Sequence, residues 1–442
     1  MCLDEIERGD YAGYPPKWGM PGEGKSMRIA IISDTHFGDF SSQLVTVDTS
    51  GQIQLGSRYA AFRDAAGRGN DYLVLLGDIV DVAINEYKIA LDIFKRFLSQ
   101  VHKDGIAERI LYIPGNHDYD LWHAIEYQAN IINPIIERKP TKQFRMSVPA
   151  VLDDRQSAKY EILLGNVTRR PDPKEPYGYM FLDSLCDEEM RFLVGFPNAY
   201  LITDTGECIV MTHGQYFQVF WSLISEWAPK VFQADLRVNQ PLSIKNVVEL
   251  NFPLSQLSSS GVGQAGPLTD VTRQMQYDFK KGIPDRLRIY LDNFCKKMCA
   301  EILKPKWYNP FDWLKKGALN RIKKSILKGL SKPHLAPKEE ENWGAKPETL
   351  KKISEYYLSA CDEIRWLNSS YDMNIPDRPN KLIFGHTHKP IALQALKPPS
   401  FKPFIGTPFE VRVFNTGAWL EGKGAELFLY ETGKGLWSVP IN

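Results

Sequence analysis

The sequence predicts an α/β fold in which strands and helices alternate. Three short apolar runs, at residues 28–33, 72–76 and 109–113, have the composition of buried strands, and helical patterns separate them. This alternation favours parallel pairing in a doubly wound arrangement, in which functional residues follow the carboxyl ends of the strands. Of the 442 residues, 43% are hydrophobic and 24% charged, which fits a globular protein and excludes a disordered or fibrous chain.

The first half of the chain carries closely spaced elements. Residues 1–27 are polar and rich in Gly and Pro, and we expect them to form an N-terminal tail. In order, the patterns then predict a strand at 28–33, a helix at 57–67, a strand at 72–76, a helix at 83–102, a strand at 109–113 and a hairpin at 200–211. We therefore assign residues 28–214 to the first part of an α/β domain.

The sequence pattern changes from strands to helices after residue 214. Residues 215–374 show long helical patterns rich in Leu, Lys, Trp and Phe, and we predict a helical insertion that forms a lid or cap. Strand patterns resume at 381–384, 411–414 and 425–430, so residues 375–442 are predicted to complete the α/β domain that residues 28–214 begin. The sequence Asn415-Thr416-Gly417 follows one of these strands, and an ordinary turn is the favoured interpretation over a place at the border of a functional site.

Cellular location is constrained by what the sequence lacks. No apolar run approaches the roughly 18 residues of a membrane-spanning helix, and residues 1–27 contain no apolar block typical of a signal peptide. The six cysteines show neither disulfide-framework nor zinc-ribbon spacing. We therefore expect a cytoplasmic protein with reduced thiols.

One segment concentrates positive charge. Residues 296–338 carry twelve Lys or Arg against two acidic residues, a net +10, so the rest of a chain of net charge +1 carries −9. Apolar residues recur at three- and four-residue steps from Phe311 to Leu330, which predicts a basic amphipathic helix with aromatic residues at its start. A cap helix with solvated lysines is the favoured interpretation; peripheral contact with an anionic membrane or a lipid substrate is the alternative.

Five short polar motifs occur in order, each just after a predicted strand. They are Asp34-Thr35-His36, Gly77-Asp78-Ile79-Val80-Asp81, Gly115-Asn116-His117-Asp118, Thr212-His213-Gly214 and Gly385-His386-Thr387-His388. Five of the eight histidines lie in these motifs. Carboxylate, imidazole and amide ligands together suit Mn²⁺, Fe or Zn²⁺, and the set fills two metal sites if one carboxylate is shared. Glycines 77 and 115 are expected to let the backbone turn sharply and bring the next side chain towards the metals.

This ordered set resembles the calcineurin-like metallophosphoesterase superfamily, whose pattern is D-x-H, G-D-x-x-D, G-N-H-D/E, a later H, and G-H-x-H. The resemblance covers residues 28 to about 214 and 380 to about 420, and it implies two facing mixed β-sheets flanked by helices. The resemblance also implies a role for each motif residue. One metal ion is held by Asp34, His36 and His388, the other by Asn116, His213 and His386, and Asp78 bridges both ions. His117 protonates the leaving oxygen or stabilises phosphoryl charge, and Asp81 orients His117.

The implied activity is hydrolysis of a phosphoester or pyrophosphate bond. Two divalent metal ions, Mn²⁺ by preference, would lower the pKa of a bridging water and neutralise charge as hydroxide attacks phosphorus. The helical insertion and the sequence Gly-His-Thr-His-Lys-Pro look similar to UDP-2,3-diacylglucosamine pyrophosphatases, although those enzymes usually carry Arg where this chain has His117.

Three alternatives stay open from the sequence. A DNA nuclease of the SbcD type shares the five motifs and would use residues 296–338 on nucleic acid, which is the less favoured partner. A soluble nucleotide or cyclic-nucleotide phosphodiesterase is the second alternative. The third is a non-catalytic scaffold like the retromer subunit with this fold, and the intact ligand set argues against it.

Overall fold

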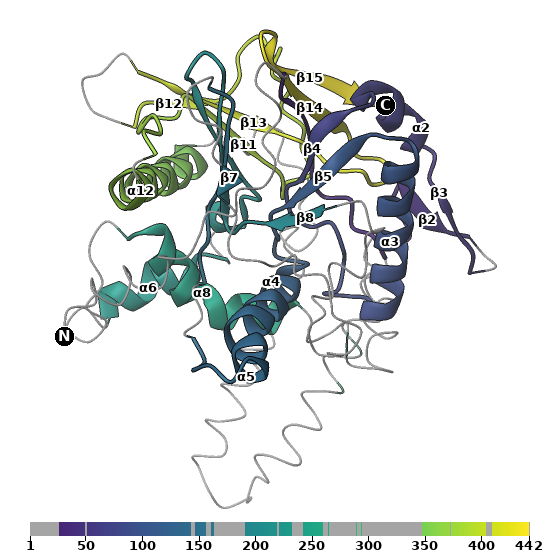
Figure 1. Ribbon diagram of the computed structural model, residues 1–442, viewed down its shortest axis with the longest axis horizontal. Coiled ribbons are helices and arrows are strands. Elements are labelled where there is room, and N and C mark those ends of the chain that lie inside the picture. Colours follow the sequence, from purple (N-terminus) through teal and green to yellow (C-terminus); the bar gives the residue numbers. More distant parts are fainter. Residues whose placement is uncertain are drawn as a thin grey trace, which may run out of the picture. The chain divides into compact units, whose positions relative to one another are not determined.

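The computed structural model describes most of the chain outside two long segments. The described residues are 26–48, 51–142, 146–155, 161–162, 191–218, 221–231, 242–259, 347–371, 373–403 and 409–441, with single residues 264, 289 and 293. The chain forms two compact units. The first comprises Met1–Gln264 and Gly344–Asn442, and the second comprises Ala265–Trp343. Nearly all of the second unit, and almost the whole predicted tail, lie outside the described residues, so the architecture below is that of the first unit (Figure 1).

A mixed six-stranded sheet contains the three strands predicted for the first half. Its order is β15 (Gly435–Ile441), β14 (Ala425–Glu431), β1 (Arg28–Ile32), β4 (Asn70–Leu75), β5 (Ala107–Tyr112) and β8 (Arg191–Val194). The last four strands are parallel, as the sequence predicts, whereas β14 runs antiparallel to both β1 and β15. The C-terminal strands therefore join the sheet that the N-terminal strands begin.

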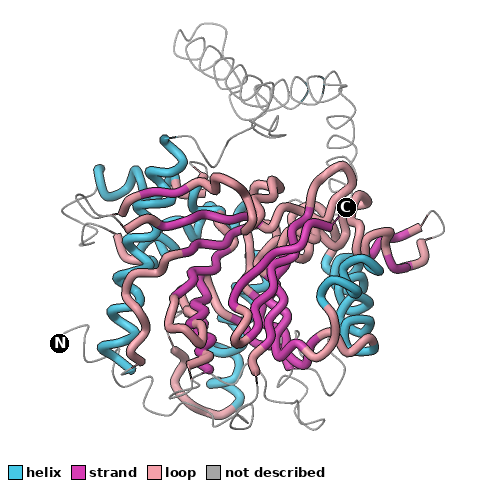
Figure 2. Tube along the Cα trace, turned by 90° about the horizontal axis from the view of Figure 1, so that it is seen from above, coloured by secondary structure: helices cyan, strands magenta, loops and turns pink. Residues whose placement is uncertain are grey.

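A second, seven-stranded sheet faces the first. Its order is β12 (Ser400–Phe401), β13 (Val411–Asn415), β11 (Lys381–Phe384), β10 (Cys208–Thr212), β9 (Asn198–Ile202), β6 (Ala150–Asp153) and β7 (Glu161–Ile162). Strands β9 and β10 form the predicted hairpin, and β10, β11 and β13 are mutually parallel. Figure 2 shows the two sheets as two layers of strands with helices outside them. The mixed sheets and flanking helices agree with the fold that the resemblance implies.

The hydrophobic core fills the space between the sheets. Alternate residues of β1, Ile29 and Ile31, belong to one apolar cluster with Met211 of β10 and Ile383 of β11. All six residues of β4 are buried, because helices cover the opposite face of the sheet. This two-sided burial explains why the strands appear in the sequence as continuous apolar runs.

Helices cover the outer faces of both sheets. The helices before the second sheet are α2 (Tyr59–Ala66), α3 (Tyr87–Lys103), α4 (Tyr119–Tyr127), a π turn (Gln128–Ile132) and α5 (Asn133–Ile136). A small hairpin of β2 (Val45–Val47) and β3 (Ile53–Leu55) forms a separate two-stranded sheet. Phe94 of α3 packs on Tyr112 of β5, with ring centroids 6.3 Å apart. Among the described helices, none combines the length and apolar character needed to cross a membrane.

The range predicted as a helical insertion, 215–374, contains helices and no strand among its described residues. They are a 3₁₀ turn η3 (Gln215–Phe217), α6 (Leu223–Val231), α8 (Ile244–Ser259) and α12 (Pro347–Tyr371). All four belong to the first compact unit, so the second unit is shorter than the predicted insertion. The basic segment 296–338 and its amphipathic helix lie outside the described residues.

Candidate metal centre

The five polar motifs follow strands that end at matching levels. In the first sheet, Ile32 of β1 is paired with Leu75 of β4, which is paired in turn with Tyr112 of β5, so the first three motifs begin side by side. In the second sheet, Met211 of β10 is paired with Ile383 of β11, which aligns the last two motifs. Because these strands are parallel, their carboxyl ends present the motifs at a common edge.

The backbone at this edge adopts an unusual conformation. Five predicted ligand residues have the positive φ angle that residues with side chains rarely adopt: Asp34 (51°), His36 (46°), Asp78 (51°), His386 (66°) and His388 (57°). Each such residue costs about 1–3 kcal/mol, and this strain persists only where the surrounding structure imposes it. Its concentration on predicted ligands is typical of a functional site.

Glycine at positions 77 and 115 leaves room for the neighbouring ligands. Gly77 has a φ of 82°, and a Cβ atom there would lie 2.4 Å from the ring of His213. At Gly115 a Cβ atom would lie 2.3 Å from Oδ1 of Asp78. The sharp turn expected at both glycines is present at Gly77, whereas Gly115 has no positive φ and is required by the close approach of Asp78.

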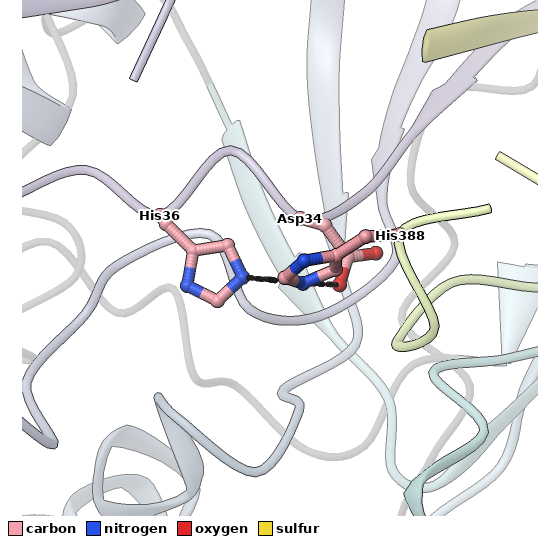
Figure 3. A group of neighbouring side chains, drawn as sticks. All are labelled: Asp34, His36 and His388. Carbon is pink, nitrogen blue, oxygen red and sulfur yellow. Dashed lines mark hydrogen bonds and ion pairs between the residues drawn. The ribbon is translucent and has the colours of Figure 1, made fainter. Parts of the chain in front are cut away.

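One ligand group combines Asp34 and His36 of the first motif with His388 of the last motif (Figure 3). The Nε2 atoms of His36 and His388 are 3.1 Å apart, and Nε2 of His388 is 3.3 Å from Oδ1 of Asp34. A cation with bonds of about 2.0–2.2 Å separates its ligands by about 3–3.5 Å, so these spacings fit a shared ion. Burial opposes ionisation of Asp34, yet the hydrogen bond from His388 and the charge of His213 outweigh it and lower the pKa of Asp34.

A second ligand group gathers around His213. Its Nε2 atom lies 3.2 Å from each of three atoms, Oδ2 of Asp78, Oδ1 of Asn116 and Nδ1 of His386. The other ring nitrogen, Nδ1, lies 3.0 Å from the carbonyl oxygen of Leu76 and donates its proton there. That hydrogen bond leaves the lone pair on Nε2 directed at the other ligands, as in metal-binding histidines.

Asp78 lies between the two groups. Its Oδ2 atom is 3.2 Å from Nε2 of His213 and 3.9 Å from Nε2 of His36, whereas its Oδ1 atom accepts the backbone N–H of His117 at 2.8 Å. Burial opposes the charge of this carboxylate, but nearby His213 and His117 hold its pKa well below the ordinary value. An ionised oxygen that faces both groups is the feature a bridging ligand needs.

The charges of the carboxylates also act on the histidines. Burial lowers the pKa of His213, but the charge of Asp78 and its hydrogen bond outweigh burial and raise that pKa to about 9. The half-buried ring of His386 lies beside His213, and its desolvation together with the charge of His213 lowers the pKa of His386 to about 3. The buried acids therefore draw positive charge into the centre, which is the role a divalent cation fills in such a site.

Asp81 connects His117 with a ligand histidine. Its Oδ1 atom lies 2.9 Å from Nδ1 of His117, the contact expected from the sequence, and its Oδ2 atom lies 3.2 Å from Nδ1 of His36. Burial lowers the pKa of His117, but the charges of Asp81 and Asp78 outweigh it and raise that pKa to about 10. His117, His36 and Asp78 also lie close enough to form a third candidate metal group, so proximity alone leaves two roles open for His117.

Sequence reasoning assigned no role to Asp118, which the structure places beneath the site. One carboxylate oxygen accepts the backbone N–H of Gly115 at 2.5 Å, and the other accepts that of Ile79 at 2.8 Å. Burial and the charge of Asp78 raise the pKa of Asp118. Asp118 thus connects the loops that carry Asp78 and Asn116, and the only sequence signal for it is its place as the last residue of a motif.

Comparison with known proteins bears on the same residues. Residues 27–223 match the family model described as calcineurin-like phosphoesterase. The matched range contains the first four polar motifs, and Gly385-His386-Thr387-His388 lies beyond it. A search of curated proteins finds no match.

Proposed function

We propose that this metal-dependent phosphoester hydrolase, whose residues 27–223 match the calcineurin-like phosphoesterase family model, holds two divalent cations that share Asp78 in its catalytic centre. The observation that carries this proposal is the position of Oδ2 of Asp78, which faces His213 of one ligand group and His36 of the other. The first ion would be held by Asp34, His36 and His388. The second would be held by Asn116, His213 and His386.

The donor set fits such ions. When bound, two divalent cations supply an activated water nucleophile and neutralise the charge of the phosphoryl group. The protein fixes the imidazole ligands beforehand, since His213 donates its Nδ1 proton to the carbonyl of Leu76 and His36 faces Asp81 through Nδ1. With Asp78 shared, each ion would have two oxygen and two imidazole ligands, a set that favours Mn²⁺, with Fe or Zn²⁺ as alternatives.

We assign the leaving-group proton to His117. Its ring is held through Nδ1 by Asp81, and its side chain is 30% exposed while that of Asp81 is 2% exposed. Against the effect of burial, the charge of Asp81 and its hydrogen bond raise the pKa of His117, which favours the protonated ring that a general acid needs. An alkoxide is a poor leaving group, and a cationic imidazole that protonates the departing oxygen lets it leave as a neutral alcohol.

The substrate class that we propose is a phosphodiester or pyrophosphate, either lipid-linked or a nucleotide. The net charge of +10 in residues 296–338 favours an anionic substrate or partner that binds this segment. The aromatic residues in the segment favour a lipid over a nucleic acid; they are Trp307, Tyr308, Phe311 and Trp313. A soluble nucleotide would need neither feature.

A hydrolysis panel with Mn²⁺ tests the proposal. The substrates are bis-p-nitrophenyl phosphate, a UDP-linked lipid, cyclic nucleotides and single-stranded DNA, each with and without a chelator. We expect chelator-sensitive hydrolysis of at least one diester or pyrophosphate. Asp154→Asn is the matched control for Asp78→Asn. Asp154 is also a buried aspartate, but it bonds Tyr430 and Thr432 at the end of the strands opposite to the metal centre. Hydrolysis that persists undiminished in chelator would contradict a metal-dependent centre.

A further inference from the structure

The turn after β13 contacts both halves of the first ligand group. Asn415 ends β13, where it is paired with Phe384, the last residue of β11, and both Asn415 and Thr416 are fully buried. The Gly385-His386-Thr387-His388 loop follows β11, and Asp34 follows β1. This turn was predicted to be an ordinary one, and its side chains instead bond residues of both loops.

Thr416 reaches Asp34 through a serine hydroxyl. The Oγ atom of Ser33 hydrogen-bonds Oδ2 of Asp34, and Oγ1 of Thr416 lies 2.5 Å from Oγ of Ser33. An ionised carboxylate only accepts hydrogen bonds, so Ser33 donates to Asp34 and Thr416 donates to Ser33. The backbone N–H of His386 also bonds this carboxylate, at 2.9 Å from Oδ2 and 3.0 Å from Oδ1.

The Ser33 bond distinguishes the two oxygens of Asp34. Oδ2 accepts the Ser33 hydroxyl, whereas the backbone N–H of His386 is shared by both oxygens. Oδ1 is the oxygen that lies 3.3 Å from Nε2 of His388 and 3.9 Å from Nε2 of His36. The hydroxyl pair therefore fixes the rotation of the carboxylate so that Oδ1 faces the two imidazoles.

Asn415 holds the loop that supplies the histidines. Its Nδ2 donates to the carbonyl oxygen of Gly385 at 2.6 Å and to Oγ1 of Thr387 at 3.1 Å, while its Oδ1 accepts the N–H of Gly417 at 2.8 Å. The residues on either side of Thr387 are His386 and His388, both with positive φ. A side chain that bonds the loop at two points restrains a strained backbone that would otherwise relax.

We propose that Ser33, Asn415 and Thr416 are positioning residues that set the affinity of the cation site formed by Asp34, His36 and His388. This inference rests on the proposed function, because it requires that site to bind a cation. Hydrogen bonds to metal ligands orient them, and loss of one such partner weakens metal binding about 10- to 100-fold. Among the described contacts, His213 and Asn116 of the second site receive no bond from these three side chains, and the link of Asn415 to that site is the loop that also carries His386.

Two substitutions test the inference. Thr416→Val removes the hydroxyl and keeps the shape, and Asn415→Asp replaces the Nδ2 donor by an acceptor that repels the carbonyl of Gly385. Asn70→Asp is the matched control, because buried Asn70 donates to the carbonyl oxygens of Ala66 and Ile106 at the other end of the first sheet. Thr416→Ser restores the hydroxyl and serves as the conservative rescue.

The measurement is equilibrium dialysis against Mn²⁺ without substrate, followed by elemental analysis, with circular dichroism to establish folding. We expect Thr416→Val to bind one of two ions about 10- to 100-fold more weakly. Asn415→Asp should weaken that ion to a similar extent and can also weaken the second, because the loop it holds carries His386 as well as His388. Asn70→Asp and Thr416→Ser should match the wild type. Folded variants with wild-type affinity for both ions would overturn the inference, and Thr416→Val decides alone if Asn415→Asp does not fold. A wild-type protein that binds no Mn²⁺ would overturn the proposed function itself.

Discussion

Removal of the His117 side chain separates its two candidate roles. The backbone N–H that bonds Oδ1 of Asp78 is present in any residue at this position, so His117→Ala leaves that contact intact. The side chain itself contacts Asp81 and packs edge-on against His36, with ring centroids 4.8 Å apart. We therefore expect His117→Ala to keep its metal ions and to lose only the proton that His117 carries.

The size of the loss depends on the leaving group. A positioned general acid contributes about 10²- to 10⁴-fold, equivalent to about 3–5.5 kcal/mol of barrier. We expect a loss of this size for a diester whose leaving group is an alkyl alcohol. For bis-p-nitrophenyl phosphate the loss should be less than about tenfold, because p-nitrophenolate leaves without a proton.

The assay is kcat/KM for both substrates, with the metal content of each protein measured in parallel. His123→Ala is the control, since His123 lies on the adjacent helix α4 and packs on Phe252, with ring centroids 5.4 Å apart. Equal losses for both leaving groups would refute proton donation and indicate that His117 stabilises phosphoryl charge. Loss of metal would place His117 among the ligands instead.

Three further predictions concern other parts of the chain. Gly115→Ala should reduce metal content and activity, because its Cβ would lie 2.3 Å from Oδ1 of Asp78; wild-type metal content in the variant would contradict the packing argument. Burial raises the pKa of Glu363, so the folded state favours its protonated form and loses stability as pH rises from the ordinary Glu value to the raised one. Urea unfolding of Glu363→Gln should therefore show a stability gain over the wild type that grows across that pH window. Glu355→Gln, at an exposed site on the same helix, is the control substitution. Binding to anionic vesicles should be abolished when four lysines are replaced by Glu, while hydrolysis of small diesters persists; steep salt-dependent binding of single-stranded DNA without vesicle binding would favour the nuclease alternative. The four are Lys315, Lys316, Lys323 and Lys324.

Sequence patterns predict the central strands because those strands are buried on both faces. β1, β4 and β5 are continuous apolar runs, and their predicted positions agree with the structure to within two residues. The edge strand β15 (GLWSVPI) escaped prediction, since it contains Gly and Pro and only two of its seven residues are buried. The four-residue strand β8 likewise leaves a pattern too short to recognise.

The same distinction holds at the site. The ligand residues can be predicted because they lie in motifs that are contiguous in sequence, and the structure brings all of these residues together. Contacts between residues of different motifs have no corresponding pattern in the sequence. Ser33 and Thr416 are 383 residues apart, and the second contact of Asp81, to His36, depends on how two loops fold against each other. Supporting residues of this kind follow from tertiary structure alone.

The number of cations bound per chain tests the central claim most directly. Elemental analysis after dialysis against Mn²⁺ should find two ions per wild-type chain. Asp78→Asn should bind fewer than one, because the shared oxygen faces both ligand groups. A single ion in the wild type, or two ions retained by Asp78→Asn, would contradict a centre bridged by Asp78.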